Sequence, residues 1–169
     1  MKIIGTLLII LGLGLGIFLG IEGALLNYHY TNQIGNYWTL ADRASTVSQK
    51  SDYIDQFVQA LDKSGLHGSS DALFFYTPEN NFDSNFQALQ SLQSRLHDIK
   101  TMDESSFAYQ TAIQQITAQE QGQAGDMLSV FQHCWTKVHY YYLWNEWVLF
   151  GLIILILGLI IVGITLISI

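Results

Sequence analysis

The hydrophobic residues of the chain are concentrated in two long stretches that contain no charged side chain. Residues 3–21 and residues 147–169 comprise 19 and 23 residues without Asp, Glu, Lys or Arg. At a rise of about 1.5 Å per residue, helices of these lengths extend about 28 and 34 Å, and the hydrocarbon core of a bilayer is about 30 Å thick. The pattern therefore predicts two transmembrane helices, one within residues 1–26 and one over residues 147–169.

A cleaved signal peptide is the alternative for the first stretch. Lys2 gives it a positive N-terminal region, and small residues occur at Gly23 and Ala24. However, the apolar run is longer than the usual 7–15 residues or so of a signal peptide, and Glu22 lies where a cleavage site favours a small side chain. We therefore expect an uncleaved anchor.

Residues 27–146 show the periodicity of amphipathic helices rather than that of strands. Apolar residues recur every seven positions from Leu40 to Leu61, as in a coiled coil. This spacing predicts a helix over residues 36–64 that is ended by Gly65.

Two further helices follow in this region. The same seven-residue spacing from Phe82 to Leu96 predicts a helix that starts near Thr77 and Pro78, a cap residue followed by proline at the first helical position. The segment Thr101–Glu104 matches the T-x-x-E capping box and predicts the start of a third helix.

The third helix has two interpretations. Its apolar stripe keeps one phase from Ile113 to Tyr141, which favours a single helix that continues into the second span. Gly122 and Gly125 each cost a helix about 1 kcal/mol relative to alanine, which favours a break and a fourth helix. We favour the continuous helix, with residues 65–81 as an excursion packed on the bundle. The side chains expected to pack there are Leu73, Phe74, Phe75 and Tyr76.

In either case the predicted fold class is all-α, with two transmembrane helices flanking an antiparallel bundle of three or four helices over residues 27–146. Lys2 and the α-amino group predict a cytoplasmic N-terminus. Two spans return the C-terminus to the cytoplasm, so the bundle is expected to be extracytoplasmic, in the periplasm or at the cell surface. Tyr and Trp residues within 28–38 and 140–147 resemble an interfacial belt and agree with this topology.

Composition narrows the possible partners. Charged residues make up 12% of the chain, against about 25% in ordinary soluble domains. Seven Lys and Arg against fourteen Asp and Glu give a net charge of −7, all of it carried by residues 27–146. The sequence offers no basic patch for phosphates, so we expect no nucleic-acid partner. The bilayer is the one partner that the sequence predicts directly.

Glycines form regular stripes in both apolar stretches. Gly12, Gly16 and Gly20 recur every four residues, and Gly151 and Gly158 are seven residues apart. Small residues at helical spacing allow another helix to approach closely in a membrane. We expect these glycines to pack helices, either against each other or against another membrane protein or a second copy of the chain.

The five histidines and the single cysteine do not match a zinc motif, so we expect no metal site. His29 follows the first span and His139 precedes the second, each by about two helical turns. Two imidazoles there could hold a haem iron from both sides, which makes a haem or redox protein one alternative. We otherwise expect no cofactor, and we expect Cys134 to be a small buried residue of the helix core.

The sequence contains none of the nucleophile, phosphate-loop or calcium-loop motifs, and we therefore expect that the protein is not an enzyme. The leading hypothesis is a structural or accessory subunit, or scaffold, of a membrane assembly. The plan of anchor, outer bundle and anchor resembles the input regions of chemoreceptors and sensor kinases. That resemblance implies the alternative of a ligand-sensing module that signals through a partner. The feature expected of such a module is a pocket between the outer helices, lined by aromatic residues such as Phe74, Phe75, Phe82 and Phe86.

Overall fold

The computed structural model describes residues 1–72, 75–140 and 146–168, without the side chains of residues 117–123 and 146. The structure is all-helical, with 83% of the residues in helices, which confirms the predicted fold class at that level.

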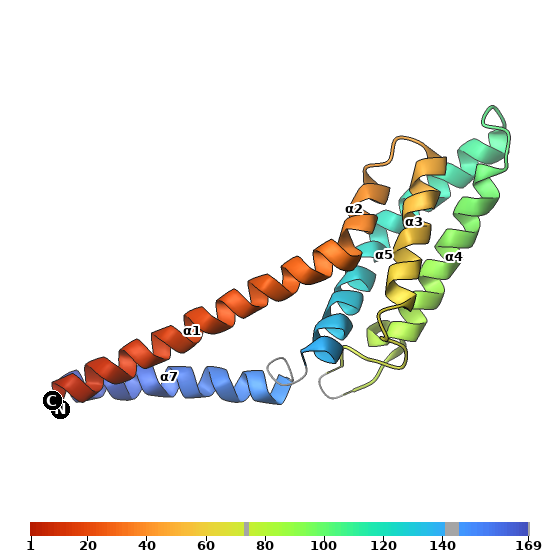
Figure 1. The fold of residues 1–169 in the computed structure, drawn as a ribbon. Helices are drawn as coiled ribbons and strands as arrows, with labels where there is room; N and C mark the ends of the chain where they lie inside the picture. The colour runs from red at the N-terminus through yellow and green to blue at the C-terminus, as the bar shows by residue number, and fades with distance from the viewer. Residues whose placement is uncertain (73–74, 141–145, 169) are drawn as a thin grey trace. The chain divides into compact units, whose positions relative to one another are not determined.

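The chain divides into two compact units, which are described separately (Figure 1). The first, called the apolar unit below, comprises Met1–His29 and Tyr140–Ile169. The second, called the bundle, comprises Tyr30–His139.

Two long helices make up the apolar unit, α1 (Lys2–Tyr30) and α7 (Glu146–Ser168). Both are long and apolar enough to cross a membrane. Only 11% of the most apolar window of the first helix and 6% of that of the second are buried by other parts of the protein, whereas the core helix of a soluble protein is mostly buried. This exposure supports the two predicted spans.

The two helices of the apolar unit run antiparallel, and the start of α1 comes closest to the end of α7. An ideal Cβ atom on Gly5 would lie 2.6 Å from the carbonyl oxygen of Gly163, and one on Gly163 would lie 2.7 Å from that of Gly5. Towards the other end, a Cβ atom on Gly12 would lie 3.0 Å from Ile160. The two chain ends therefore lie at the same end of this unit (Figure 1).

Helix α1 does not end where the bundle begins. It continues through a π-helical turn, η1 (Thr31–Gly35), into α2 (Asn36–Asp42), and residues 2–42 form one uninterrupted helix of 41 residues.

The prediction of one helix over residues 36–64 is wrong, because the chain breaks after α2. Helix α3 (Val47–Asp62) begins anew, with extended backbone at Thr46 and the Thr46 hydroxyl accepting a hydrogen bond from the Gln49 amide. The cap satisfies a backbone donor that a continuous helix would have paired internally. Gly65 follows the end of α3 and has a φ of +73°, a conformation that glycine adopts without strain.

The segment between α3 and α4 (Phe82–Lys100) is irregular. A 3₁₀ turn, η2 (Pro78–Asn80), occupies the predicted helix start at Thr77 and Pro78, and α4 begins after it, capped by Asn81. The side chains of Phe75 and Tyr76 are 81% and 66% exposed. The prediction that they pack on the bundle is therefore wrong, and Leu73 and Phe74 lie outside the described residues.

Helix α5 (Phe107–His139) is continuous through Gly122 and Gly125, which confirms the single-helix interpretation up to His139. The predicted continuation into the second span falls on residues 141–145, which are not described. The predicted capping box at Thr101 is wrong, because the hydroxyl of Ser106 accepts the hydrogen bond from the Tyr109 amide.

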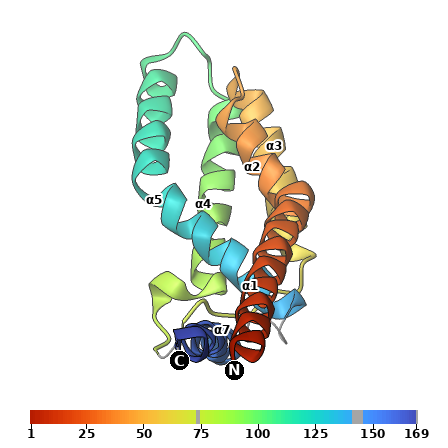
Figure 2. The same cartoon turned by 90° about the vertical axis from the view of Figure 1, so that its left-hand side faces the viewer.

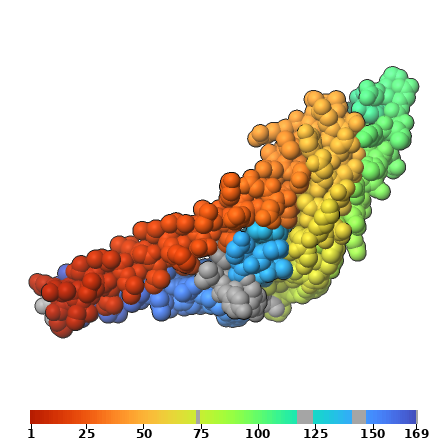
Figure 3. All heavy atoms as spheres, viewed as in Figure 1, coloured from red at the N-terminus to blue at the C-terminus, as the bar shows by residue number. Residues whose placement is uncertain are grey.

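The core of the bundle lies where α3, α4 and α5 meet (Figure 2). Phe57, Phe82 and Phe131, one from each helix, are fully buried. The Phe131 ring contacts the other two edge-on, with centroids 6.0 Å from Phe57 and 5.3 Å from Phe82. Helix α2 adds Trp38, whose ring lies 5.6 Å from Phe57, and the space-filling view shows α2 beside α3 (Figure 3). The helices are therefore joined by an aromatic centre.

Candidate ligand-binding cleft

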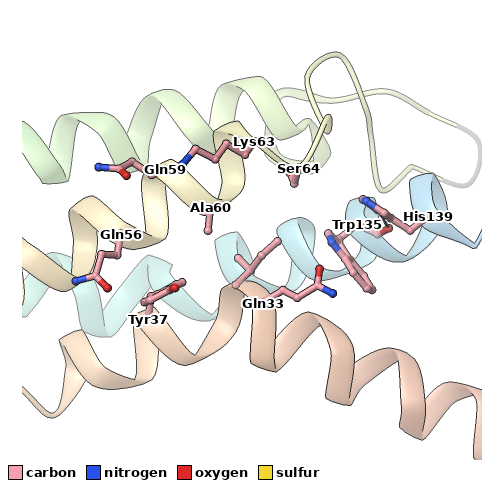
Figure 4. A pocket seen from close by; sticks show the side chains of 10 residues that line it. Gln33, Tyr37, Gln56, Gln59, Ala60, Lys63, Ser64, Trp135 and His139 are labelled. Atoms are coloured by element: carbon pink, nitrogen blue, oxygen red, sulfur yellow. Dashed lines mark hydrogen bonds between the residues drawn. The ribbon is translucent and has the colours of Figure 1, made fainter.

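A cleft of about 410 Å³ opens in the bundle between η1 with α2, the C-terminal half of α3, and the C-terminal part of α5 (Figure 4). Its size is within the range of about 300–1,000 Å³ that is usual for small-molecule sites. Amide, hydroxyl and amine groups dominate its walls. The lining residues are Gln33, Ile34, Tyr37, Gln56, Gln59, Ala60, Lys63, Ser64, Trp135 and His139.

The π-helical turn forms one wall of the cleft. Gln33 lines the cleft beside Ile34, whose side chain is only 2% exposed. A π-turn inserts one extra residue per turn and is found frequently at functional sites, because it moves side chains out of the regular helical positions. The turn is packed against the ring of Tyr30, since an ideal Cβ atom on Gly35 would lie 3.4 Å from that ring.

Trp135 and His139, one turn apart on α5, form the opposite wall. Trp135 is buried and its ring stacks on the His139 ring at 4.7 Å, with 20° between the planes. His139 Nδ1 lies 3.0 Å from the carbonyl oxygen of Trp135. Because a carbonyl oxygen can only accept, Nδ1 carries the proton, and the neutral ring keeps its lone pair on Nε2.

Helix α3 supplies the third wall. The Ser64 hydroxyl donates to the Leu61 carbonyl, and one Gln56 amide hydrogen is used on the Asp52 carbonyl at 3.3 Å. Lys63 has no ion pair among the described residues. In Figure 4 its side chain extends along α3 toward Gln59, while Ala60 projects from the helix between them.

The two histidines proposed for haem belong to different units. His29 lies in the apolar unit, with its ring 6.0 Å from that of Tyr28, whereas His139 lies in the bundle and lines the cleft. The haem hypothesis stays a prediction.

The predicted helix-packing glycines fall into two groups. Gly12 lies close to α7, as described above. An ideal Cβ atom on the other four would meet no atom within 4 Å in the described part of the chain. These four, whose packing against another chain stays a prediction, are Gly16, Gly20, Gly151 and Gly158.

The predicted aromatic pocket is not formed by its described members. Phe82 and Phe86 stack on each other at 5.3 Å in the core, and the His67 ring contacts both edge-on at 5.4 Å. Phe75 is exposed and Phe74 is not described. Aromatic residues at helical spacing here fill the core instead of lining a cavity.

Outside the cleft, several histidines pair with aspartates from other elements. His67, in the segment after α3, lies 3.1 Å from Asp83 and 3.2 Å from Asp62, and hydrogen bonds to these carboxylates raise the pKa of His67, the Asp83 bond most. His133 on α5 lies 3.1 Å from Asp71, whose hydrogen bond raises the pKa of His133 against the opposing effect of burial. Each pair links two elements of the bundle.

No group of three or more potential metal ligands occurs within the described residues. Cys134 is fully buried, as predicted for a residue of the helix core, and desolvation raises the pKa of its thiol, so that it is unreactive in the folded state.

Sequence reasoning did not find the cleft, although one local signal was present. Trp135 and His139 are four residues apart and therefore lie on the same face of a helix.

Comparisons of the chain with protein-family models, with curated proteins and with solved structures find no match.

Proposed function

We propose that the protein is a two-span membrane protein whose extracytoplasmic bundle binds a small polar ligand in the cleft and signals this binding to a partner protein. The observation that carries the proposal is that η1, which lines the cleft, belongs to the same uninterrupted helix as the first apolar stretch.

The π-helical turn gives a physical route for such a signal. A π-helical turn is rare and occurs mostly as a single turn inside an α-helix, so we expect η1 to exchange with a regular α-helical form. A ligand that contacts Gln33 and prefers one form of the turn shifts the population toward that form. We expect the change in the turn to alter the geometry of the helix over residues 2–42 that contains it.

A cleft-filling variant tests the proposal. Ala60 projects into the cleft from α3, so Ala60→Trp fills it (Figure 4). Ala88→Trp is the matched control, because Ala88 lies on the exposed face of α4. A panel of small polar compounds is screened by thermal shift on the full-length protein in detergent. Compounds that stabilise the wild type and the control but not Ala60→Trp support the proposal; equal shifts in all three proteins, or no shift with any compound, contradict it.

The topology is tested with a single introduced thiol. Phe107 is 86% exposed at the start of α5, and the native cysteine is removed by Cys134→Ser. In intact cells, Phe107→Cys in this background is expected to react with a membrane-impermeant maleimide. Reaction only after the membrane is made permeable would place the bundle in the cytoplasm and contradict the proposed orientation.

A second candidate function is that of an accessory or scaffold subunit. It is favoured by Gly16 and Gly20 on α1 and by Gly151 and Gly158 on α7, where no atom of the described chain lies close. Faces of small residues admit a further helix at short distance. After crosslinking in native membranes, a partner or a second copy is expected to co-purify with the wild type and to be lost in Gly16→Leu/Gly20→Leu. A protein that is monomeric and without partners in mild detergent contradicts this function.

A further inference from the structure

We infer that the cleft takes a small organic carboxylate that also carries a hydroxyl or amino group, with Lys63 holding the carboxylate. This inference rests on the proposed function and adds the chemical class of the ligand. It follows from the charges and from the hydrogen-bonding capacity that the cleft residues have left.

Lys63 gives the cleft a positive charge. Of the ten lining residues, Lys63 is the only one that is permanently charged at neutral pH, and no carboxylate lines the cleft. The adjacent Asp62 forms no ion pair with Lys63 among the described residues and contacts His67 at 3.2 Å. Lys63 is exposed to solvent, and its positive charge attracts a ligand with a negative group and repels a cationic one.

One ammonium group suits a carboxylate better than a phosphate. Phosphate carries up to two charges and is usually bound by arginine forks or by several cations or backbone amides. The cleft contains no arginine and a single lysine. Lys63 extends toward Gln59, whose amide has no hydrogen bond within the described chain, so the two together offer a cation and a neutral donor to two carboxylate oxygens (Figure 4).

Two lining residues offer acceptors, Ser64 next to Lys63 and His139 on α5. The Ser64 hydroxyl has already donated its hydrogen to Leu61 and keeps only its lone pairs. His139 has used Nδ1 on the Trp135 carbonyl and presents an acceptor at Nε2 in its neutral form. Acceptors in a binding site need a donor from the ligand, and a hydroxyl or amino group supplies it.

Gln33 offers further hydrogen bonds to a carboxylate that carries a hydroxyl or amino group. The side-chain amide of Gln33 has no hydrogen bond to another described residue, and it can both donate and accept. This residue lies on η1, so a ligand that binds Gln33 as well as Lys63 and His139 contacts the π-helical turn (Figure 4). The ligand would therefore touch all three walls of the cleft at once.

The test uses matched probes and full-length protein in a non-ionic detergent. The probes are 4-hydroxybutyrate, 4-hydroxybutyramide and butyrate, which differ in one group each. Binding is measured by isothermal calorimetry and by the total tryptophan fluorescence, to which Trp135 in the cleft contributes. 4-Hydroxybutyrate is expected to bind tightest, because the amide lacks the charge that Lys63 recognises and butyrate lacks the donor.

Two lysine variants locate the charge. Lys63→Gln is expected to weaken 4-hydroxybutyrate by about 10- to 100-fold, the range for loss of one charge-assisted hydrogen bond, and to leave the amide unchanged. Lys50→Gln, on the same helix but outside the cleft, is the control and is expected to bind like the wild type. Lys63→Arg is expected to recover most of the affinity.

The outcomes separate this inference from the proposed function. If the amide binds as tightly as the acid, or if Lys63→Gln leaves acid binding unchanged, the carboxylate assignment is wrong while the cleft remains a ligand site. If none of the three probes binds, the inference is also overturned, and the cleft-filling screen decides the proposed function separately.

Discussion

The aromatic centre of the bundle allows a quantitative prediction for Phe131→Ala. Phe131 is fully buried, and its ring joins α5 to α3 and to α4 through contacts with Phe57 and Phe82. Truncation of a buried phenylalanine to alanine costs about 3–5 kcal/mol, and the two lost edge-on contacts, worth about 0.5–1.5 kcal/mol each beyond burial, argue against the lower end of that range. We therefore expect the free energy of unfolding to fall by about 4 kcal/mol.

Urea denaturation of the full-length protein in detergent measures this loss. Trp38 lies edge-on to Phe57, so its fluorescence reports on the same core. With a urea dependence of about 1–3 kcal/mol per molar, a loss of about 4 kcal/mol lowers the midpoint by at least about 1 M. Phe75→Ala is the control, because this ring is 81% exposed and its removal is expected to leave the midpoint unchanged. If both variants unfold at the wild-type midpoint, Phe131 is not part of the core and the helix arrangement described here is wrong.

Three further predictions follow from other parts of the structure. The pKa values of His67 and His133 are raised above the ordinary value of about 6.5 by their aspartate partners, so both residues stabilise the bundle fully below pH 6.5 and lose this effect as the pH rises through their folded-state pKa values. Stability measured between pH 6 and 8.5 should therefore fall with pH in the wild type and fall less in His67→Gln/His133→Gln; a parallel decline would refute this origin. Gly163→Leu should separate α1 from α7, whereas Gly151→Leu, with open space around it, should not, as judged by the crosslinking yield between cysteines introduced on the two helices; equal yields would contradict the close approach. Thr46→Ala should cost about 1 kcal/mol in urea denaturation through loss of the α3 cap, and Thr46→Ser should recover it; no difference between them would show that the hydroxyl does not cap the helix.

The sequence predicted the features that depend on local pattern. The uncharged stretches identified α1 and α7, and the spacing of Phe82 and Leu96 identified α4. It did not show the break before α3, because apolar residues keep their spacing from Leu40 to Val47 across the break. The T-x-x-Q sequence at Thr46 was nevertheless a signal for the helix start, and Thr46 does cap α3.

Features that depend on contacts between distant segments could not be predicted. The T-x-x-E match at Thr101 predicted a helix start, but α5 starts five residues later. There the Ser106 hydroxyl accepts the hydrogen bond from the Tyr109 amide. The cleft brings Gln33, Lys63 and His139 together from three elements, and no single stretch of sequence contains that arrangement. Only the packing of the bundle creates it.

The burial of Cys134 has a practical consequence for studies in membranes, where denaturants are difficult to use. The thiol has no exposed surface in the folded bundle, so a thiol reagent reaches it only when α5 separates from its neighbours. When opening and closing are fast, the rate of modification reports the population of the open state. Each tenfold slowing relative to a free cysteine corresponds to about 1.4 kcal/mol of opening free energy. The native thiol thus serves as a probe for the opening of the bundle that can be used in an intact membrane without a mutation or a denaturant.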